Sequence, residues 1–198
     1  MIILLYMNIL IKKIRDLCIM VKHKEKKMFF DNFSSFSSNH NFTTEGWRVT
    51  LLKLIHMFKF GSEIKDLYIW ADGGLKTKET IHLFSTLGTI LNVKIHLNYF
   101  APYHGHSEVD AHFGQGKRNL RNQAKNGPIV CEEQIYSSFR QLPSTQVELI
   151  TPLQAPSQLK PFSKQIKKWF EWFLFQGKIF CREKSGEGEW TEQFVQFI

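Results

Sequence analysis

Two short segments of the chain carry the side chains best suited to chemistry. In the first, Asp72 follows the apolar run LYIWA (67–71) and precedes two glycines, which let the backbone bend and leave space beside the carboxylate. The second segment holds four acidic and histidine side chains: His104, His106, Glu108 and Asp110. Each segment alone also fits a structural role, because Asp72 suits a turn, and Ser107 with Asp110 has the spacing of a helix capping box.

The pattern between the two segments predicts that they meet in space. Residues 67–71 resemble a buried strand, residues 77–91 show a helical period, and residues 93–100 alternate with period two. A strand, helix, strand unit with short links normally forms a parallel pair with a right-handed crossover. Both strands then end at the same sheet edge, where open α/β sheets bind ligands. We therefore expect Asp72 and the helix that begins near Ser107 to lie at one edge.

Two converging carboxylates indicate divalent-cation chemistry. Magnesium prefers oxygen ligands and keeps several waters, so Asp72 and Asp110 could share it. Two such ions, about 4 Å apart, stabilise the attacking and leaving oxygens of a phosphoryl displacement. Behind the acids, the same helix carries a basic group without an intervening acid, suited to a nucleic-acid backbone: Lys117, Arg118, Arg121 and Lys125.

Composition limits the class of protein. The chain has 198 residues, of which 43% are hydrophobic, and a net charge of +8, which favours anionic partners such as nucleic acids. Its three cysteines form no CxxC pair, so a zinc ribbon or disulfide framework is not indicated, and a reducing compartment fits best. The apolar N-terminus is too short to span a bilayer and is expected to be a core element. No phosphate loop of the GxxxxGK[ST] type occurs.

The remaining segments predict further elements and one boundary. We expect a strand hairpin from DLCIMVKH (16–23) and KMFFDNF (27–33), and a helix over residues 46–60. After a Pro-rich loop, the C-terminal third predicts a small antiparallel meander. We place a domain boundary at Gly127, giving a core over residues 1–127 and a β-rich extension over residues 128–198.

Residues 65–120 resemble the second half of the catalytic core of eukaryotic DDE transposases. The motifs that carry this resemblance are WADGG (70–74), NYF (98–100), HGH (104–106), Asp110, Gly114 and KR (117–118). The resemblance implies an α/β fold: a partial ribonuclease H-like mixed sheet with flanking helices, plus a small β-rich C-terminal extension.

The resemblance also implies roles for individual residues. Asp72 would be the second catalytic acid and Asp110 the third, both ligating Mg²⁺ or Mn²⁺, with Glu108 as the fallback for Asp110. His104 would lie beside the metal ions and orient a scissile phosphate. His106 stands where the family has a lysine, at a phosphate-facing position that we assign to DNA binding.

The family's first acid has no clear counterpart in this chain. Neither Asp16 nor Asp31 has a convincing context, so we expect the first strand, with its acid, to lie upstream of Met1. The expected function is that of a transposase-derived protein whose ancestral activity is metal-dependent DNA cleavage and strand transfer, and which is itself inactive. We expect a nuclear or other intracellular location, double-stranded DNA as partner and no membrane association or secretion, and we leave a homo-oligomer open.

Two alternatives remain. One is a basic nucleic-acid-binding module that keeps the sheet without the chemistry. The other is a metallo-hydrolase that uses His104, His106 and Asp110, although the spacing departs by two residues from the usual metallo-β-lactamase pattern.

Overall fold

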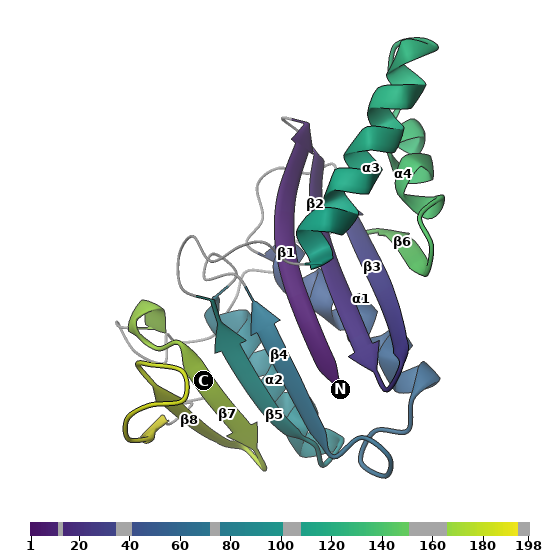
Figure 1. The fold of residues 1–198 in the computed structure, drawn as a ribbon. Helices are drawn as coiled ribbons and strands as arrows, with labels where there is room; N and C mark the ends of the chain where they lie inside the picture. Colours follow the sequence, from purple (N-terminus) through teal and green to yellow (C-terminus); the bar gives the residue numbers. More distant parts are fainter. Residues whose placement is uncertain (12–13, 35–40, 72–75, 101–107, 151–165, 194–198) are drawn as a thin grey trace.

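A computed structural model describes residues 1–11, 14–34, 41–71, 76–100, 108–150 and 166–193 (Figure 1). Four α-helices lie in these ranges: α1 (Asn41–Met57), α2 (Lys78–Ile90), α3 (Glu108–Lys125) and α4 (Glu132–Arg140). The strands are β1 (Ile2–Ile11), β2 (Ile14–His23), β3 (Lys26–Ser34), β4 (Asp66–Ala71), β5 (Lys94–Tyr99), β6 (Thr145–Leu149), β7 (Glu171–Phe175), β8 (Lys178–Arg182) and β9 (Thr191–Gln193). A 3₁₀ turn, η2 (Ile166–Lys168), precedes β7.

The strands form one mixed sheet in the order β6-β3-β2-β1-β4-β5-β7-β8-β9. Strands β1 to β3 pair antiparallel, as consecutive strands joined by short turns do. Strands β1, β4 and β5 are mutually parallel. Helix α1 lies between β3 and β4 in the chain, and helix α2 lies between β4 and β5. The protein therefore has an α/β fold.

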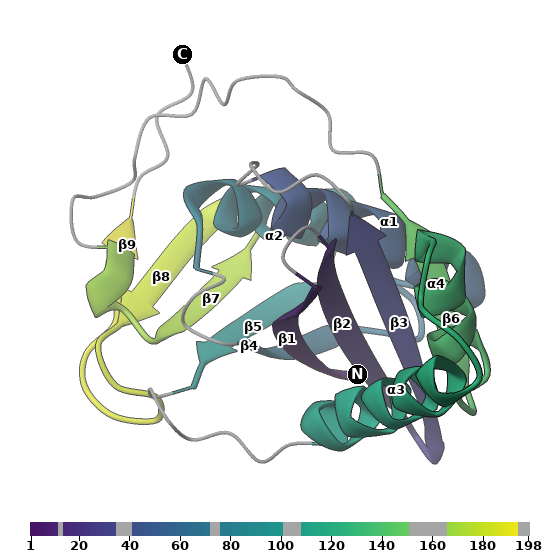
Figure 2. The same ribbon diagram turned by 90° about the horizontal axis from the view of Figure 1, so that it is seen from above.

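Helices cover the two faces of the sheet (Figure 2). Helices α1 and α2 lie on one face, and α3 and α4 lie on the other, over β1, β2, β3 and β6. Alternation along β2 explains this, because Leu17 and Ile19 join the core under α1 and α2, whereas Cys18 and Met20 join the core under α3 and α4. A sheet whose strands bury both faces needs such helices on each side.

The predicted strand, helix, strand unit is confirmed. Strands β4 and β5 are adjacent and parallel, with Asp66 opposite Lys94 and Ala71 opposite Tyr99. Helix α2 joins them and begins after Thr77, whose hydroxyl accepts a hydrogen bond from the Thr80 amide at 3.1 Å. The helix predicted near Ser107 is α3, which ends at Lys125, before the Asn-Gly-Pro stop.

The N-terminal residues form a strand that the sequence did not predict. The predicted hairpin is present as β2 and β3, and strand β1 precedes it in the chain. Strand β1 pairs with β2 on one side and with β4 on the other. The apolar residues of the N-terminus thus form the centre of the sheet.

The C-terminal third also differs from the expected extension. The predicted meander is present as β7 to β9, but it continues the main sheet, because β7 pairs antiparallel with β5. Strand β6 pairs in parallel with β3 at the opposite edge. Helix α4 was not predicted. Trp172 and Leu174 on β7 lie in the same core as residues of β4 and β5.

Candidate functional site

The carboxyl ends of β4 and β5 form the edge where the sequence predicted a site. Ala71 and Tyr99 are register partners, and the Phe100 amide donates to the Ala71 carbonyl at 2.9 Å. The backbone therefore leaves both strands at one edge, as predicted. Asp72, His104 and His106 themselves lie outside the described residues.

The first turn of α3 holds the other two predicted acids. Val109 is fully buried against the sheet, whereas its neighbours Glu108 and Asp110 differ in how far they are exposed to solvent. Glu108 is exposed and forms an ion pair with Lys27 at the start of β3. Asp110 is half-buried. Both carboxylates also suit the positive end of the helix dipole, and the role of Asp110 as third acid stays a prediction.

The described carboxylates do not make a complete magnesium site. Strand β1 pairs with β4 on the side away from β5. Its sequence, IILLYMNILI, contains neither Asp nor Glu. Hard cations such as Mg²⁺ and Mn²⁺ need several oxygen ligands, so no magnesium- or manganese-dependent step follows from the described residues.

Lys76 is a basic group at this edge that the sequence did not single out. It lies two residues before α2, with Nζ 4.7 Å from the ring centroid of Tyr99 and 4.3 Å from that of Phe170. Its ammonium also donates to the Trp169 carbonyl. Burial lowers the pKa of Lys76 to about 8. Trp169 and Phe170 come from the C-terminal third and Tyr99 from β5, so local sequence gave no signal for these contacts.

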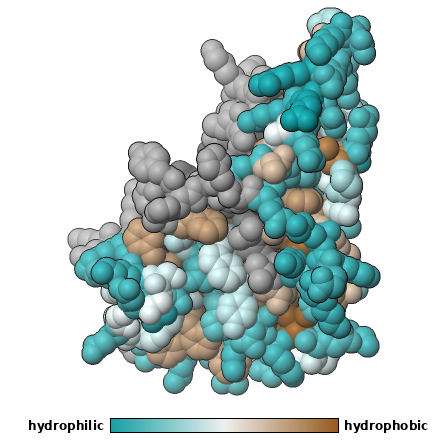
Figure 3. Space-filling model, viewed as in Figure 1, coloured by the Kyte–Doolittle hydropathy of each residue, from teal (hydrophilic) through white to brown (hydrophobic). Residues whose placement is uncertain are grey.

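The basic part of α3 projects beyond the end of the sheet (Figure 1). Arg118, Arg121 and Lys125 are exposed there, and Lys117 is half-buried. Hydrophilic side chains cover this projection (Figure 3). At its base, Gly116 lets the ring of Phe139 in α4 approach closely, which fixes α3 against α4. All four predicted basic residues therefore lie on one protruding helix.

A buried polar cluster lies under the N-terminal half of α3. Cys18 on β2, Asp31 on β3 and His112 on α3 place one potential ligand atom each within 4.8 Å of one another. Nε2 of His112 lies 2.7 Å from Oδ2 of Asp31. The second carboxylate oxygen, Oδ1, has no hydrogen-bond partner. The side chains of His112 and Asp31 are 3% and 0% exposed, so solvent hardly reaches the pair.

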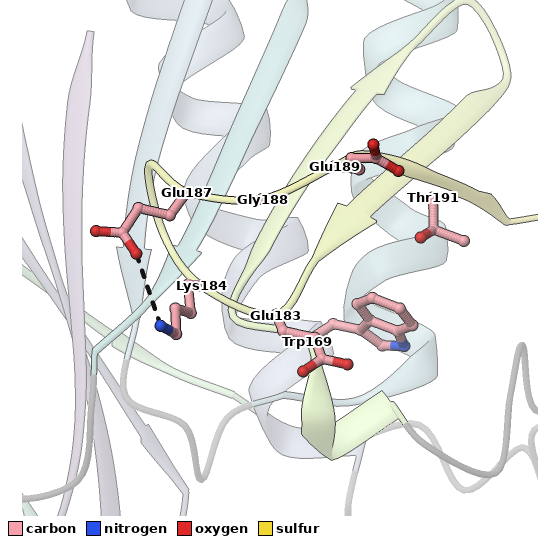
Figure 4. A pocket seen from close by; sticks show the side chains of 7 residues that line it. All are labelled: Trp169, Glu183, Lys184, Glu187, Gly188, Glu189 and Thr191. Carbon is pink, nitrogen blue, oxygen red and sulfur yellow. Dashed lines mark ion pairs between the residues drawn. The ribbon is translucent and has the colours of Figure 1, made fainter.

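A shallow pocket beside β8 has no clear ligand chemistry. It measures about 450 Å³ and is lined by Trp169, Thr191 and charged side chains from the loop after β8 (Figure 4). Glu187 pairs with Lys184 at 3.7 Å, and Glu183 pairs with Lys168. Two of the three acids that line the pocket, Glu183 and Glu187, are therefore already paired with lysines.

Comparisons with protein-family models, curated proteins and solved structures find no match to this chain. None of the helices in the described ranges is long and apolar enough to cross a membrane.

Proposed function

We propose that the chain is a transposase-derived, ribonuclease H-like protein that binds duplex DNA without cleaving it. The observation that carries this proposal is the strand arrangement. A ribonuclease H-like core needs three antiparallel strands followed by two parallel ones, in the order 3-2-1-4-5, and β3-β2-β1-β4-β5 has this order and these directions. Of the motifs that resemble those of transposases, WADGG begins in the last two residues of β4 and HGH comes after β5 in the sequence, and the ends of these strands form the edge where such a core holds its acids.

The absence of cleavage follows from the sequence of β1. In this fold the first acid belongs to the central strand, which pairs with both β2 and β4. Since IILLYMNILI offers no carboxylate, Asp72 and Asp110 would lack a ligand that both metal ions share. The features that support DNA binding are electrostatic: a net charge of +8 and the projecting basic part of α3.

The test measures duplex DNA binding by the full chain as a function of salt. Each phosphate contact contributes roughly 0.9 to the slope of log affinity against log salt. Replacing Lys117, Arg118 and Arg121 together by Gln should therefore flatten the slope by about two to three units. A matched control, Lys22→Gln with Lys59→Gln and Lys178→Gln, removes the same charge from exposed lysines outside α3.

Two results would contradict the proposal. If both triple variants lower the slope equally, α3 is not the DNA surface and binding depends on net charge alone. Nicking of supercoiled DNA by the wild-type chain with Mg²⁺ or Mn²⁺, abolished by Asp72→Ala, would show that the missing carboxylate is not needed or is supplied by another residue. We expect a slope change confined to the α3 variant and no nicking.

A further inference from the structure

We propose that Cys18, Asp31 and His112 form a binding site for one zinc ion that fastens α3 to the β2–β3 hairpin. The proposal is independent of DNA binding, because none of these residues lies at the carboxyl edge of β4 and β5 or on the projecting part of α3. It rests on the positions of three ligand atoms, on the unpaired oxygen of Asp31 and on the chemistry of the donor set.

The backbone places two of the ligands side by side. Cys18 and Asp31 are direct register partners in the antiparallel β2–β3 pair, so their side chains leave the same face of the sheet. His112 reaches them from α3, where Val109 and Phe113 are also buried. The ligands thus come from three different elements, and their atoms lie within 4.8 Å of one another.

These separations suit a tetrahedral ion. Zinc binds sulfur at about 2.3 Å and nitrogen or oxygen at about 2.0–2.2 Å, which puts neighbouring ligand atoms roughly 3–4 Å apart. Nε2 of His112 and Oδ2 of Asp31 are 2.7 Å apart and would have to separate slightly. Rotation of the Asp31 carboxylate would instead present Oδ1 to the ion and leave most of the geometry unchanged.

The unpaired Oδ1 of Asp31 is the second observation that indicates a ligand. This oxygen is buried and has no hydrogen-bond partner among the described residues, while the carboxyl group as a whole is 0% exposed. Buried acceptors are nearly always paired, because a buried polar atom without a partner destabilises the fold. His112 occupies only Oδ2, so a cation would provide the missing interaction.

The donor set selects the type of metal. One thiolate, one imidazole and one carboxylate suit zinc and similar transition metals, whereas magnesium and calcium prefer oxygen ligands alone. Three protein ligands leave the fourth tetrahedral position for a water. The ring of Phe29 stacks on His112 with centroids 4.2 Å apart, which shields this side of the site. Zinc bound at such a shielded site would stabilise the folded chain. Its binding would release the thiol proton of Cys18, because the thiolate is the form that binds the ion.

Cobalt provides a direct probe, because tetrahedral Co²⁺ bound to a thiolate has a ligand-to-metal charge-transfer band. The full chain is stripped with EDTA and titrated with Co²⁺, and then with Zn²⁺. We expect one equivalent of Co²⁺ to produce the band and Zn²⁺ to abolish it. At a hundredfold excess over its Kd, Zn²⁺ should raise the melting temperature by about 5–10 °C.

Matched cysteine variants locate the site. Cys18→Ser removes the thiolate ligand and should abolish the band and the thermal shift. Cys181→Ser is the control, since Cys181 is equally buried but lies in the core on the other face of the sheet, so this variant should keep both signals. If Cys18→Ser does not fold, zinc protection of the wild-type thiols during partial unfolding, mapped by alkylation and mass spectrometry, identifies the ligand.

The wild-type titration can overturn the proposal without any variant. If neither the charge-transfer band nor a thermal shift appears, Asp31 and His112 form a metal-free buried pair. A band that survives in Cys18→Ser, or protection confined to Cys131 or Cys181, would place the metal elsewhere and reject this site.

Discussion

The side chains of His112 and Asp31 meet in the protein interior although 81 positions separate them in the sequence. Their contact, 2.7 Å between Nε2 and Oδ2, joins α3 to β3. The ring of Phe29, also on β3, stacks on His112. The pair is nearly inaccessible to solvent, so neither partner can exchange the other for water. This contact therefore gives α3 a fixed position along β3, in addition to the apolar packing of Val109 and Phe113.

The first prediction concerns this pair in the absence of metal. His112→Phe keeps the ring that stacks on Phe29 but leaves the buried carboxyl of Asp31 without a partner, which should reduce the free energy of unfolding by about 3 kcal/mol. Urea denaturation in EDTA measures the change. The double variant Asp31→Leu with His112→Phe should recover part of the loss, because both polar groups are then gone. A loss below about 0.5 kcal/mol for His112→Phe would mean that the pair contributes little to stability.

Hydrophobic periodicity in the sequence predicted several elements of the fold correctly. The apolar run 67–71 and the alternation over 93–100 predicted a parallel pair joined by a helix, and β4, α2 and β5 confirm it. The same holds for the β2–β3 hairpin and for the end of α3 before Asn126. Each of these elements depends on hydrophobic periodicity or on a helix-stop signal, and both can be recognised within a short stretch of sequence.

Contacts between segments far apart in the chain could not be predicted from the sequence patterns. The cluster of Cys18, Asp31 and His112 depends on the hairpin register and on where α3 docks, and neither can be read from three separated segments. The role of β1 was missed because an apolar N-terminus without an acid did not match the expected first strand. The continuation of the sheet by β7 next to β5 requires a contact between segments more than 70 residues apart, which no periodicity encodes.

The second prediction tests the packing of α3 on α4. A Cβ at Gly116 would lie 2.4 Å from Cε1 and 2.5 Å from Cζ of Phe139, so Gly116→Ala should force the helices apart and lower the free energy of unfolding by about 1–3 kcal/mol. Gly114→Ala is the control on the same helix, since nothing lies within 4 Å of its added Cβ, and it should stabilise by up to about 1 kcal/mol. Chemical denaturation of both variants measures the difference. Equal effects of the two substitutions would contradict the close contact.

The third prediction uses the three thiols. Cys131 is exposed, whereas Cys18 and Cys181 are buried, and burial raises the pKa of the Cys181 thiol to about 11 although a hydrogen bond from Gln193 opposes this. Because the thiolate is the reactive form, iodoacetamide at pH 8 should label Cys131 and leave Cys181 unmodified in the folded chain. Mass spectrometry of the peptides, in EDTA, measures the labelling. Labelling in urea is the control, where all three should react, and rapid labelling of Cys181 in the folded chain would contradict its burial.

The last prediction concerns the pH dependence that Lys76 gives to stability. Burial lowers its pKa to about 8 in the folded chain, from a model-compound value of 10.5 that we assign to the unfolded chain. Below pH 8 both states carry the charge, and the folded state bears the full penalty of burying it. As the pH rises from 8 to 10.5 the folded state loses its proton first, so the penalty disappears and stability increases. Relative to Lys76→Met, which has no such group, the wild-type chain should therefore gain stability across this interval.

The urea midpoint of both chains, measured at intervals from pH 7 to pH 10.5, gives this difference directly. Only the change with pH is diagnostic, because Lys76→Met also removes the hydrogen bond to Trp169 and the contacts with the rings of Tyr99 and Phe170 at every pH. Lys178→Met is the control, since Lys178 is exposed at the start of β8 and its replacement should leave the pH dependence of the wild type unchanged. A difference between wild type and Lys76→Met that stays constant with pH would mean that contacts with the two rings stabilise the ammonium enough to offset its burial.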